Sequence, residues 1–180
     1  MALRRRLIRR LVEDLLEKNA VHSAPVPVDV IAQKDGVDIR YEAADDGLSG
    51  FLLRGTAATG EWRAIIGVNI NHHENRRRFS IAHELGHLFL HPSGEVVHID
   101  ADSVFHVRRR DSESAKGTDP DEREANAFAA ELLMPESFLQ EDLERISALD
   151  DGAISYLANR YGVSPQALTF RLANLGYRID

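Results

Sequence analysis

Hydrophobic residues recur every three or four positions in the first part of the chain. Leucine stands at positions 3, 7, 11 and 15, and further apolar residues stand at positions 8, 12 and 16. This spacing predicts an amphipathic helix over residues 3–19 with a charged opposite face. A shorter helix is predicted over residues 28–34, after two prolines and before Gly36.

Three short apolar runs follow, at residues 37–41, 48–54 and 62–68, and turn-like segments separate them. Runs of this length between turn signals are typical of β-strands. Because the connections are short, we expect a small, mainly antiparallel three-stranded sheet connected as a meander.

The rest of the pattern is mostly helical. Helices are predicted over residues 75–90, 120–134 and 135–148, the second of them capped by Asp119, and a pair over 153–161 and 165–174. Residues 95–118 give no clear assignment, although short strands would fit there. The whole pattern predicts an α+β fold with a main domain over residues 1–148 and a helical appendage over residues 149–180.

The composition excludes several classes of function. The 180 residues contain no cysteine, so thiol nucleophiles, disulfides and cysteine-ligated zinc are ruled out, and a metal site must use His, Asp or Glu. A net charge of −7 disfavours general nucleic-acid binding. No apolar run is long enough to span a membrane, and acidic residues interrupt the segment where a signal peptide would be apolar. We therefore expect a cytoplasmic protein with no membrane partner.

Seven of the eight histidines fall between positions 72 and 106. Two of them, His83 and His87, are four residues apart on a predicted helix, so their side chains lie one turn apart on the same face. Glu84 follows His83 directly and can reach a metal-bound water without ligating the metal. This is the H-E-x-x-H arrangement of zinc peptidases. His72 and His73 precede the helix, and we expect both to face solvent.

A catalytic zinc site normally has three protein ligands, so a third must come from elsewhere in the chain. The helix predicted over residues 120–134 is the best source. A helical projection places Glu122 on the apolar side with Asn126, and it places Glu124 on the polar side near Glu131. The projection therefore favours Glu122 as the ligand over Glu124. Asn126, one turn further on, is placed to hydrogen-bond a ligating histidine.

Two segments of the chain resemble the ImmA/IrrE family of metallopeptidases. Residues 78–87 read RFSIAHELGH, and residues 122–135 read EREANAFAAELLMP. Residues 48–51 (LSGF) and 25–27 (PVP) extend the resemblance over nearly the whole chain. The family's Glu-x-x-Ala-Asn/Asp pattern corresponds to Glu122, Ala125 and Asn126.

The resemblance implies a zincin-like fold, with the sheet packed on the active-site helix, and a zinc-dependent endopeptidase of the gluzincin type. Zn²⁺ is the expected metal, with Mn²⁺ or another divalent ion as an alternative. Studied members of the family cleave a partner repressor and thereby switch on stress-response or mobile-element genes. We therefore expect a helix-turn-helix repressor as the protein substrate.

In the expected mechanism, His83, His87 and Glu122 bind the metal and Glu84 is the general base. A nearby donor would stabilise the oxyanion, and the candidates are His91, His98 and His106. The substrate of a zincin is bound as an added strand on a sheet edge. Residues 48–54 or 62–68 are the two candidates for that edge.

The final helix pair has helix-turn-helix spacing, with Gly162 in the turn and Ser164 capping the second helix. Gln166, Thr169 and Arg171 would then be exposed for DNA contact. The acidic chain favours the other interpretation, a hairpin that packs on the catalytic core. An alternative function is accordingly a DNA- or protein-binding regulator with a structural or vestigial metal. Arg76, Arg77 and Arg78 begin the site helix against its dipole, which predicts a specific salt bridge or a substrate contact.

Overall fold

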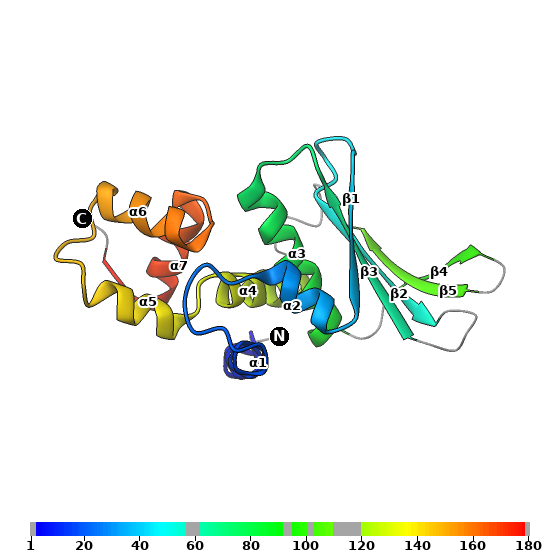
Figure 1. The fold of residues 1–180 in the computed structure, drawn as a ribbon, viewed down its shortest axis with the longest axis horizontal. Coiled ribbons are helices and arrows are strands. Elements are labelled where there is room, and N and C mark those ends of the chain that lie inside the picture. The colour runs from blue at the N-terminus through cyan, green and yellow to red at the C-terminus, as the bar shows by residue number, and fades with distance from the viewer. Residues whose placement is uncertain (1–2, 57–61, 92–94, 101–102, 110–119, 179–180) are drawn as a thin grey trace.

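The computed structural model describes residues 3–56, 62–91, 95–100, 103–109 and 120–178, and the side chains of 56, 62–63, 95–100 and 103–109 are not considered. A five-stranded sheet lies at one end of the described structure, and three helices, α5 to α7, lie at the other end (Figure 1). Between them are the site helices, α3 and α4. The sheet consists of β1 (Val37–Glu42), β2 (Gly50–Thr56), β3 (Trp62–Asn69), β4 (Glu95–Asp100) and β5 (Ser103–Arg109).

The strand order is β1-β3-β2-β5-β4, and only the β1–β3 pair is parallel. The expected antiparallel character is therefore confirmed, but the meander and the limit of three strands are wrong. The chain passes from β1 across the end of β3 before β2 begins. Asn69 at that end is 2% exposed, and its side-chain amide donates to the carbonyls of Ala44, Asp45 and Leu48 at 2.9–3.0 Å. These hydrogen bonds satisfy backbone carbonyls of the segment between β1 and β2. Strand β1 therefore pairs with the edge of β3 opposite to the edge that pairs with β2.

The helices are α1 (Arg5–Lys18), α2 (Val28–Lys34), α3 (Glu74–Leu90), α4 (Pro120–Leu133), α5 (Glu136–Leu143), α6 (Asp151–Tyr161) and α7 (Pro165–Leu175). The predicted helix over residues 135–148 is thus shorter than expected. Ser164 caps α7 by accepting a hydrogen bond from the Ala167 N–H at 3.2 Å, and Gly162 ends α6 with φ of +63°, as the sequence predicts. The Asp119 cap predicted for α4 lies outside the described residues.

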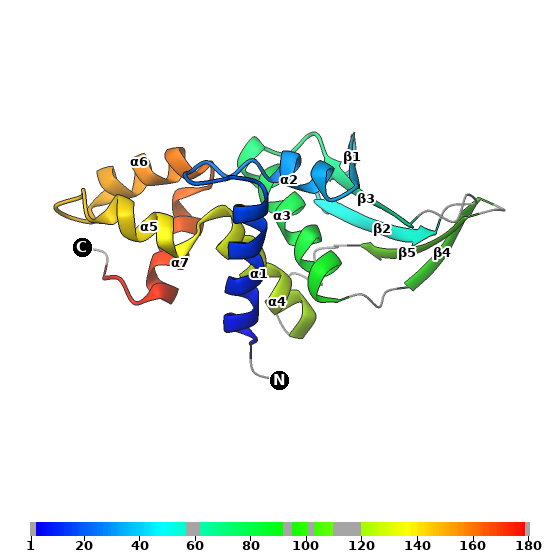
Figure 2. The same cartoon turned by 60° about the horizontal axis from the view of Figure 1, so that its bottom comes forward.

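Helix α3 is the centre of the fold. It packs against β2 and β3 on one side, and its most extensive contact is with α4 (Figure 2). Helix α1 lies against α4, and α2 lies between α3 and β1. Fully buried residues from the sheet and both central helices form one core: Leu52, Ile66, Ile81, Leu85, Phe128 and Leu132. This core holds α3 and α4 in a fixed relation to each other.

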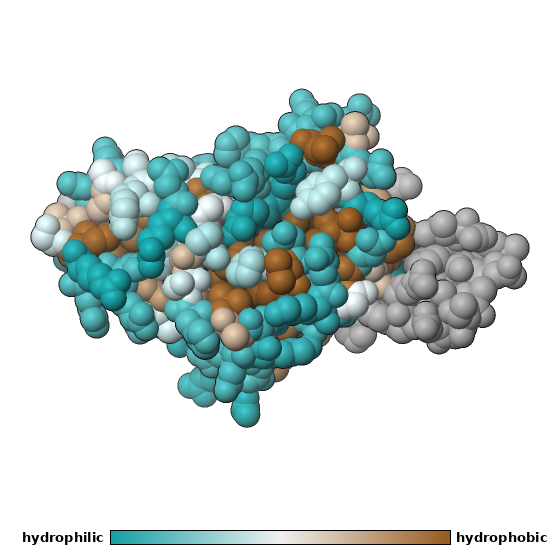
Figure 3. Space-filling model, viewed as in Figure 1, coloured by the Kyte–Doolittle hydropathy of each residue, from teal (hydrophilic) through white to brown (hydrophobic). Residues whose placement is uncertain are grey.

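Hydrophobic residues also gather on the surface near the middle of the molecule, over α2, where hydrophilic residues surround them (Figure 3). Among the described residues, no helix is both long and apolar enough to cross a lipid bilayer. The division at residue 148 into a main domain and an appendage stays a prediction.

Candidate metal centre

The H-E-x-x-H segment lies in the second half of α3. His73 begins this helix as its N-cap, since its Nδ1 accepts a hydrogen bond from the Asn75 N–H at 3.3 Å. His83 is 0% exposed and His87 is 1% exposed. Their Nε2 atoms lie 2.9 Å apart, as expected for side chains one helical turn apart on one face. Burial of two imidazoles in this way requires polar partners nearby.

Glu122 of α4 is the nearest acidic partner. One carboxylate oxygen lies 3.3 Å from His83 Nε2, and the other lies 3.2 Å from His87 Nε2. Burial alone would raise the pKa of Glu122, but hydrogen bonds and charge interactions with the two histidines hold it well below its usual range. Glu122 is therefore an ionised carboxylate at neutral pH.

A glycine brings the two helices together at this point. A Cβ added to Gly86 would lie 3.0 Å from the Ala125 Cα and 3.2 Å from the Phe128 Cβ. Both distances are shorter than ordinary carbon–carbon contacts. Gly86 thus allows α4 to approach α3 closely, and Glu122 lies one turn before Ala125 on the approaching face. The contact between Gly86 and Ala125, one from each of the two sequence motifs, therefore positions the Glu122 carboxylate.

Asn126 determines which nitrogen of His83 is available. Its Oδ1 lies 3.0 Å from His83 Nδ1. Because an amide oxygen only accepts hydrogen bonds, His83 Nδ1 donates to Asn126, and Nε2 is the ring nitrogen that faces His87 and Glu122 and is available to a metal ion. An outer hydrogen bond of this kind fixes the tautomer of metal-ligating histidines.

The three groups fit a metal ion. His83, His87 and Glu122 each offer a ligand atom within 4.8 Å of the other two, and all three are buried. In a tetrahedral zinc site with bonds of about 2.0 Å, neighbouring ligand atoms are separated by about 3.3 Å. The two Nε2 atoms lie 2.9 Å apart, and they lie 3.3 and 3.2 Å from the two different oxygens of the Glu122 carboxylate, so the donor atoms are grouped on the scale of this separation. Two imidazole nitrogens with one carboxylate are a donor set that Zn²⁺ accepts.

Glu84 lies beside the three candidate ligands but outside the set. It is 1% exposed, and a Cβ on Gly50 would lie 3.9 Å from its Oε1, so its carboxylate sits below the start of β2. Position 50 has no space for a side chain, because a Cβ added to Gly50 would lie 2.8 Å from the Gly67 carbonyl oxygen. Glu84 thus follows the candidate ligand His83 in α3, and its carboxylate is covered by the start of β2.

Glu124 shares a polar face with Glu131 as expected, but this face is buried. Glu124 is 6% exposed and accepts hydrogen bonds from Arg4 Nε at 2.9 and 3.1 Å. Hydrogen bonding to Arg4 lowers the pKa of Glu124. Glu131 on the same face is 7% exposed and pairs with Arg171 at 2.6 Å. Helices α1 and α7 cover this face of α4. A projection of α4 alone cannot predict this, because it does not include the neighbouring helices.

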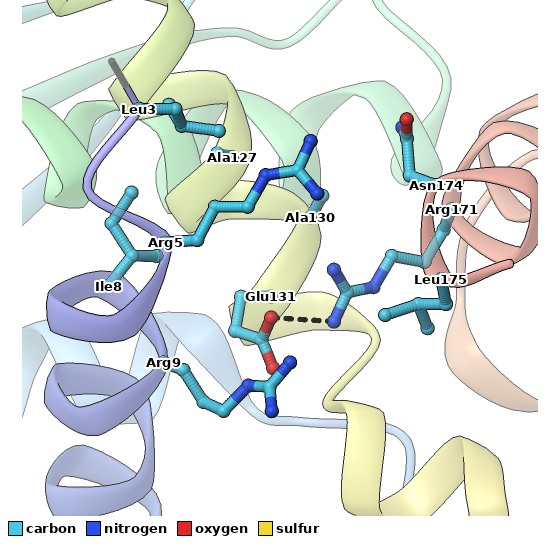
Figure 4. A pocket seen from close by; sticks show the side chains of 10 residues that line it. All are labelled: Leu3, Arg5, Ile8, Arg9, Ala127, Ala130, Glu131, Arg171, Asn174 and Leu175. Atoms are coloured by element: carbon cyan, nitrogen blue, oxygen red, sulfur yellow. Dashed lines mark hydrogen bonds and ion pairs between the residues drawn. The ribbon is translucent and has the colours of Figure 1, made fainter.

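Figure 4 shows this second face, with Glu131 of α4 between Arg9 of α1 and Arg171 of α7. Arg9 is paired with Glu136 of α5. Arg9, Glu131 and Arg171 line a small cavity of about 120 Å³ between α1, α4 and α7. Arg171 also donates to the Met134 carbonyl at 3.1 Å, and only 10% of its side chain is exposed. The expectation that Arg171 is exposed for DNA contact is therefore wrong, whereas Gln166 is exposed.

The three candidate oxyanion donors differ in what the structure describes. His91 follows α3 and is 6% exposed; its ring lies 5.6 Å from the His87 ring, and its Nδ1 lies 3.5 Å from Asp121 Oδ1. His98 belongs to β4 and His106 to β5, but their side chains lie outside the described residues. The oxyanion role stays a prediction for all three.

The other histidine and arginine expectations are partly corrected. His73 is exposed as expected, but His72 is only 8% exposed. Arg78 forms no ion pair among the described residues and instead donates to the carbonyls of Val26 and Gly162 at 2.9 and 3.2 Å. Burial lowers the pKa of Arg78. Arg78 thus connects α3 to the end of α6 through backbone carbonyls and not through the salt bridge that was one expectation for this run.

Both strands expected to offer a substrate edge are interior. β3 lies between β1 and β2, and β2 lies between β3 and β5. Their backbone groups are already paired on both sides, so neither can accept an added strand. The edges of the sheet are β1 and β4.

One buried residue near the site was missed from the sequence. Arg54 of β2 is 3% exposed, and its Nη1 donates to the His87 carbonyl at 3.3 Å. A charged residue on the same face of a strand as the buried Leu52 was the available signal. Arg54 ties the sheet to the last turn of α3.

Comparisons with known proteins identify the family of the chain. Residues 32–173 match the peptidase M78 family, described as the IrrE N-terminal-like domain. An 87-residue segment is 34% identical to the uncharacterized immunity region protein 2 of Bacillus phage phi105 and makes up 48% of each protein, so the match spans about half of that relative. A solved Mycobacterium tuberculosis transcriptional regulator superposes with a TM-score of 0.54 at 14% identity, covering 92% of this chain and 46% of that protein. At that identity the likeness concerns the fold alone.

Proposed function

Because the chain belongs to the peptidase M78 family of IrrE N-terminal-like domains, we propose that it is a zinc-dependent endopeptidase that cleaves a protein partner. The observation that carries the proposal is the convergence of His83, His87 and Glu122 from two helices, with the buried Glu84 next to His83 in the sequence of α3. A zincin-like fold with residues 1–148 as the peptidase domain is part of the proposal. So is a cytoplasmic location.

In this proposal His83 Nε2, His87 Nε2 and a Glu122 oxygen hold the metal, and Asn126 keeps His83 in the ligating tautomer. When bound, a zinc ion would polarise the substrate carbonyl and lower the pKa of a water toward about 7. Glu84 takes a proton from the attacking water and delivers it to the leaving amine nitrogen, so that a C–O bond forms as the C–N bond breaks. Burial of Glu84 keeps competing water away from this proton transfer.

The proposed substrate is a helix-turn-helix repressor whose cleavage derepresses stress-response or mobile-element genes. The similarity to a phage immunity-region protein supports this class of partner. A direct DNA-binding function has less support, because Arg171 is engaged in packing α7 on α4. Mn²⁺ as the working metal is the remaining alternative to Zn²⁺.

The proposal is tested with Glu84→Gln in the zinc-loaded protein. Substrates are a mixed peptide library and a panel of helix-turn-helix repressors, and products are identified by mass spectrometry. We expect the cleavage rate to fall by on the order of 10²- to 10⁴-fold with one zinc retained per chain. Glu141→Gln, the same change at an exposed position, should leave the rate unchanged. Equal rates for Glu84→Gln and the wild type would contradict the mechanism.

A further inference from the structure

A second concavity lies beside the candidate metal centre. It has a volume of about 510 Å³ and is formed by the first half of α3, the end of α4 and the start of α7. Its walls are mostly apolar, and we call it the Phe79 pocket after the residue nearest the site. It is lined by apolar Phe79, Met134, Val163, Pro165 and Ala167, together with His73, Asn75, Arg76 and Ser164.

The Phe79 pocket continues the helix face that carries the candidate ligands. Arg76, Phe79 and His83 are three and four residues apart, so they lie along one side of α3. The Phe79 ring centroid is 6.1 Å from that of His83. A polypeptide with a peptide bond at the candidate metal centre would therefore extend one of its side chains toward this pocket.

Three of the polar side chains that line the pocket form hydrogen bonds within the fold. Ser164 Oγ accepts from the Ala167 N–H, and His73 Nδ1 accepts from the Asn75 N–H. Arg76 donates from Nη2 to the Ser49 hydroxyl at 2.8 Å. What these residues leave for a ligand is apolar surface, which selects an apolar group.

The far wall of the pocket is fixed relative to α3. Arg78 donates to the Gly162 carbonyl at 3.2 Å, directly before Val163 and Ser164. A Cβ on Gly162 would lie 2.8 Å from Arg78 Nε, so the turn between α6 and α7 lies close against this arginine. The pocket is thus held in shape by the structure before any substrate binds.

We propose that the Phe79 pocket receives one large apolar side chain of the protein substrate, of leucine, methionine or phenylalanine size, close to the cleaved bond. It thereby selects the site of cleavage. This inference rests on the proposed endopeptidase function. A volume of 510 Å³ is within the range of ligand sites and leaves space for the side chain and some flanking backbone.

The first test fills the pocket with Ala167→Phe, and Ala173→Phe on the exposed side of the same helix is the matched control. Zinc-loaded wild type should cleave a peptide library with a large apolar residue enriched at one fixed position relative to the cut. The preference is the ratio of the cleavage rate of peptides with a large apolar residue at that position to the rate of peptides with alanine there. Ala167→Phe should reduce this ratio by on the order of 10- to 200-fold, and Ala173→Phe should leave it unchanged. Cleavage without such a preference, or a preference unchanged in Ala167→Phe, would overturn the inference.

The second test does not depend on activity. The methyl groups of Met134, Val163 and Ala167 are followed by NMR in the wild type while N-acetyl-leucine amide or N-acetyl-alanine amide is added. The leucine compound should shift these methyl signals and the alanine compound should not. If no peptide is cleaved, the proposed function fails, but NMR shifts with the leucine compound would still support the pocket. If the leucine compound causes no shifts, the pocket inference is overturned whether or not peptides are cleaved.

Discussion

Helix α4 buries carboxylates on two opposite faces, and the partners on the two faces differ in kind. Toward α3, Glu122 meets the imidazoles of His83 and His87. Toward α1 and α7, Glu124 and Glu131 are paired with arginines. A neutral imidazole can give its lone pair to a cation, whereas a guanidinium has no lone pair to give and stays charged. Burial of a carboxylate therefore does not identify a metal ligand; its partners do.

The largest expected difference between the two faces is in metal affinity. Glu122→Ala removes one of three ligands and should weaken zinc binding about 10³-fold, since each ligand accounts for about 4 kcal/mol of a structural-type zinc site. Glu124→Ala, the matched change on the other face, should keep the wild-type affinity. Competition titration with a zinc chelator measures both. Loss of zinc in Glu124→Ala with retention in Glu122→Ala would reverse the assignment.

Changes on the other face of α4, where Glu124 and Glu131 pair with arginines, should instead alter the free energy of unfolding. Arg171→Ala leaves Glu131 buried without its ion-pair partner and should lower the free energy of unfolding by about 3 kcal/mol, as measured by urea denaturation. Zinc affinity should be unchanged. Arg145→Ala is the control, because 74% of that side chain is exposed and its contact with Asp142 is 3.9 Å long; its effect should be within about 0.5 kcal/mol. A loss of zinc in Arg171→Ala would show that the two faces are coupled.

A smaller effect should come from the hydrogen bond behind the metal centre. Asn126→Ala removes the acceptor that fixes the His83 tautomer and should weaken zinc binding by about 10- to 100-fold. Asn126→Asp keeps an acceptor and should stay near the wild type, as should Asn159→Ala at an exposed position. Equal affinities for the alanine and aspartate variants would mean that Asn126 does not orient His83.

The site was more predictable than its surroundings because it depends on spacing within single helices. The four-residue step from His83 to His87 and the projection that favoured Glu122 both describe one helix at a time. The burial of Glu124 could not be predicted in this way, because its partner Arg4 is 120 residues away in sequence. Helical projections show the apolar side of a helix but not how many sides its neighbours cover.

The fold shows the same limit. The pattern of apolar runs predicted the three strands near residues 37–68, and turn chemistry predicted the caps at Gly162 and Ser164. The order of the strands depends on Asn69, which holds the segment from β1 to β2 across the end of β3. A single buried asparagine is indistinguishable in sequence from an ordinary turn residue. Long-range pairing, unlike local periodicity, has no signature within a window of a few residues.

The approach of α3 to α4 at Gly86 has a thermodynamic consequence. His83 and His87 belong to one helix and Glu122 to another, so an ion held by all three would act as a cross-link between segments that begin 46 residues apart in the chain, at Glu74 and Pro120. An ion that binds only the folded chain stabilises it by mass action, by about 4.1 kcal/mol at a free concentration 1,000 times its Kd. Folding of this protein would then follow the free metal concentration around it, and scarcity of the ion would loosen the same helix pair that carries the candidate catalytic residues.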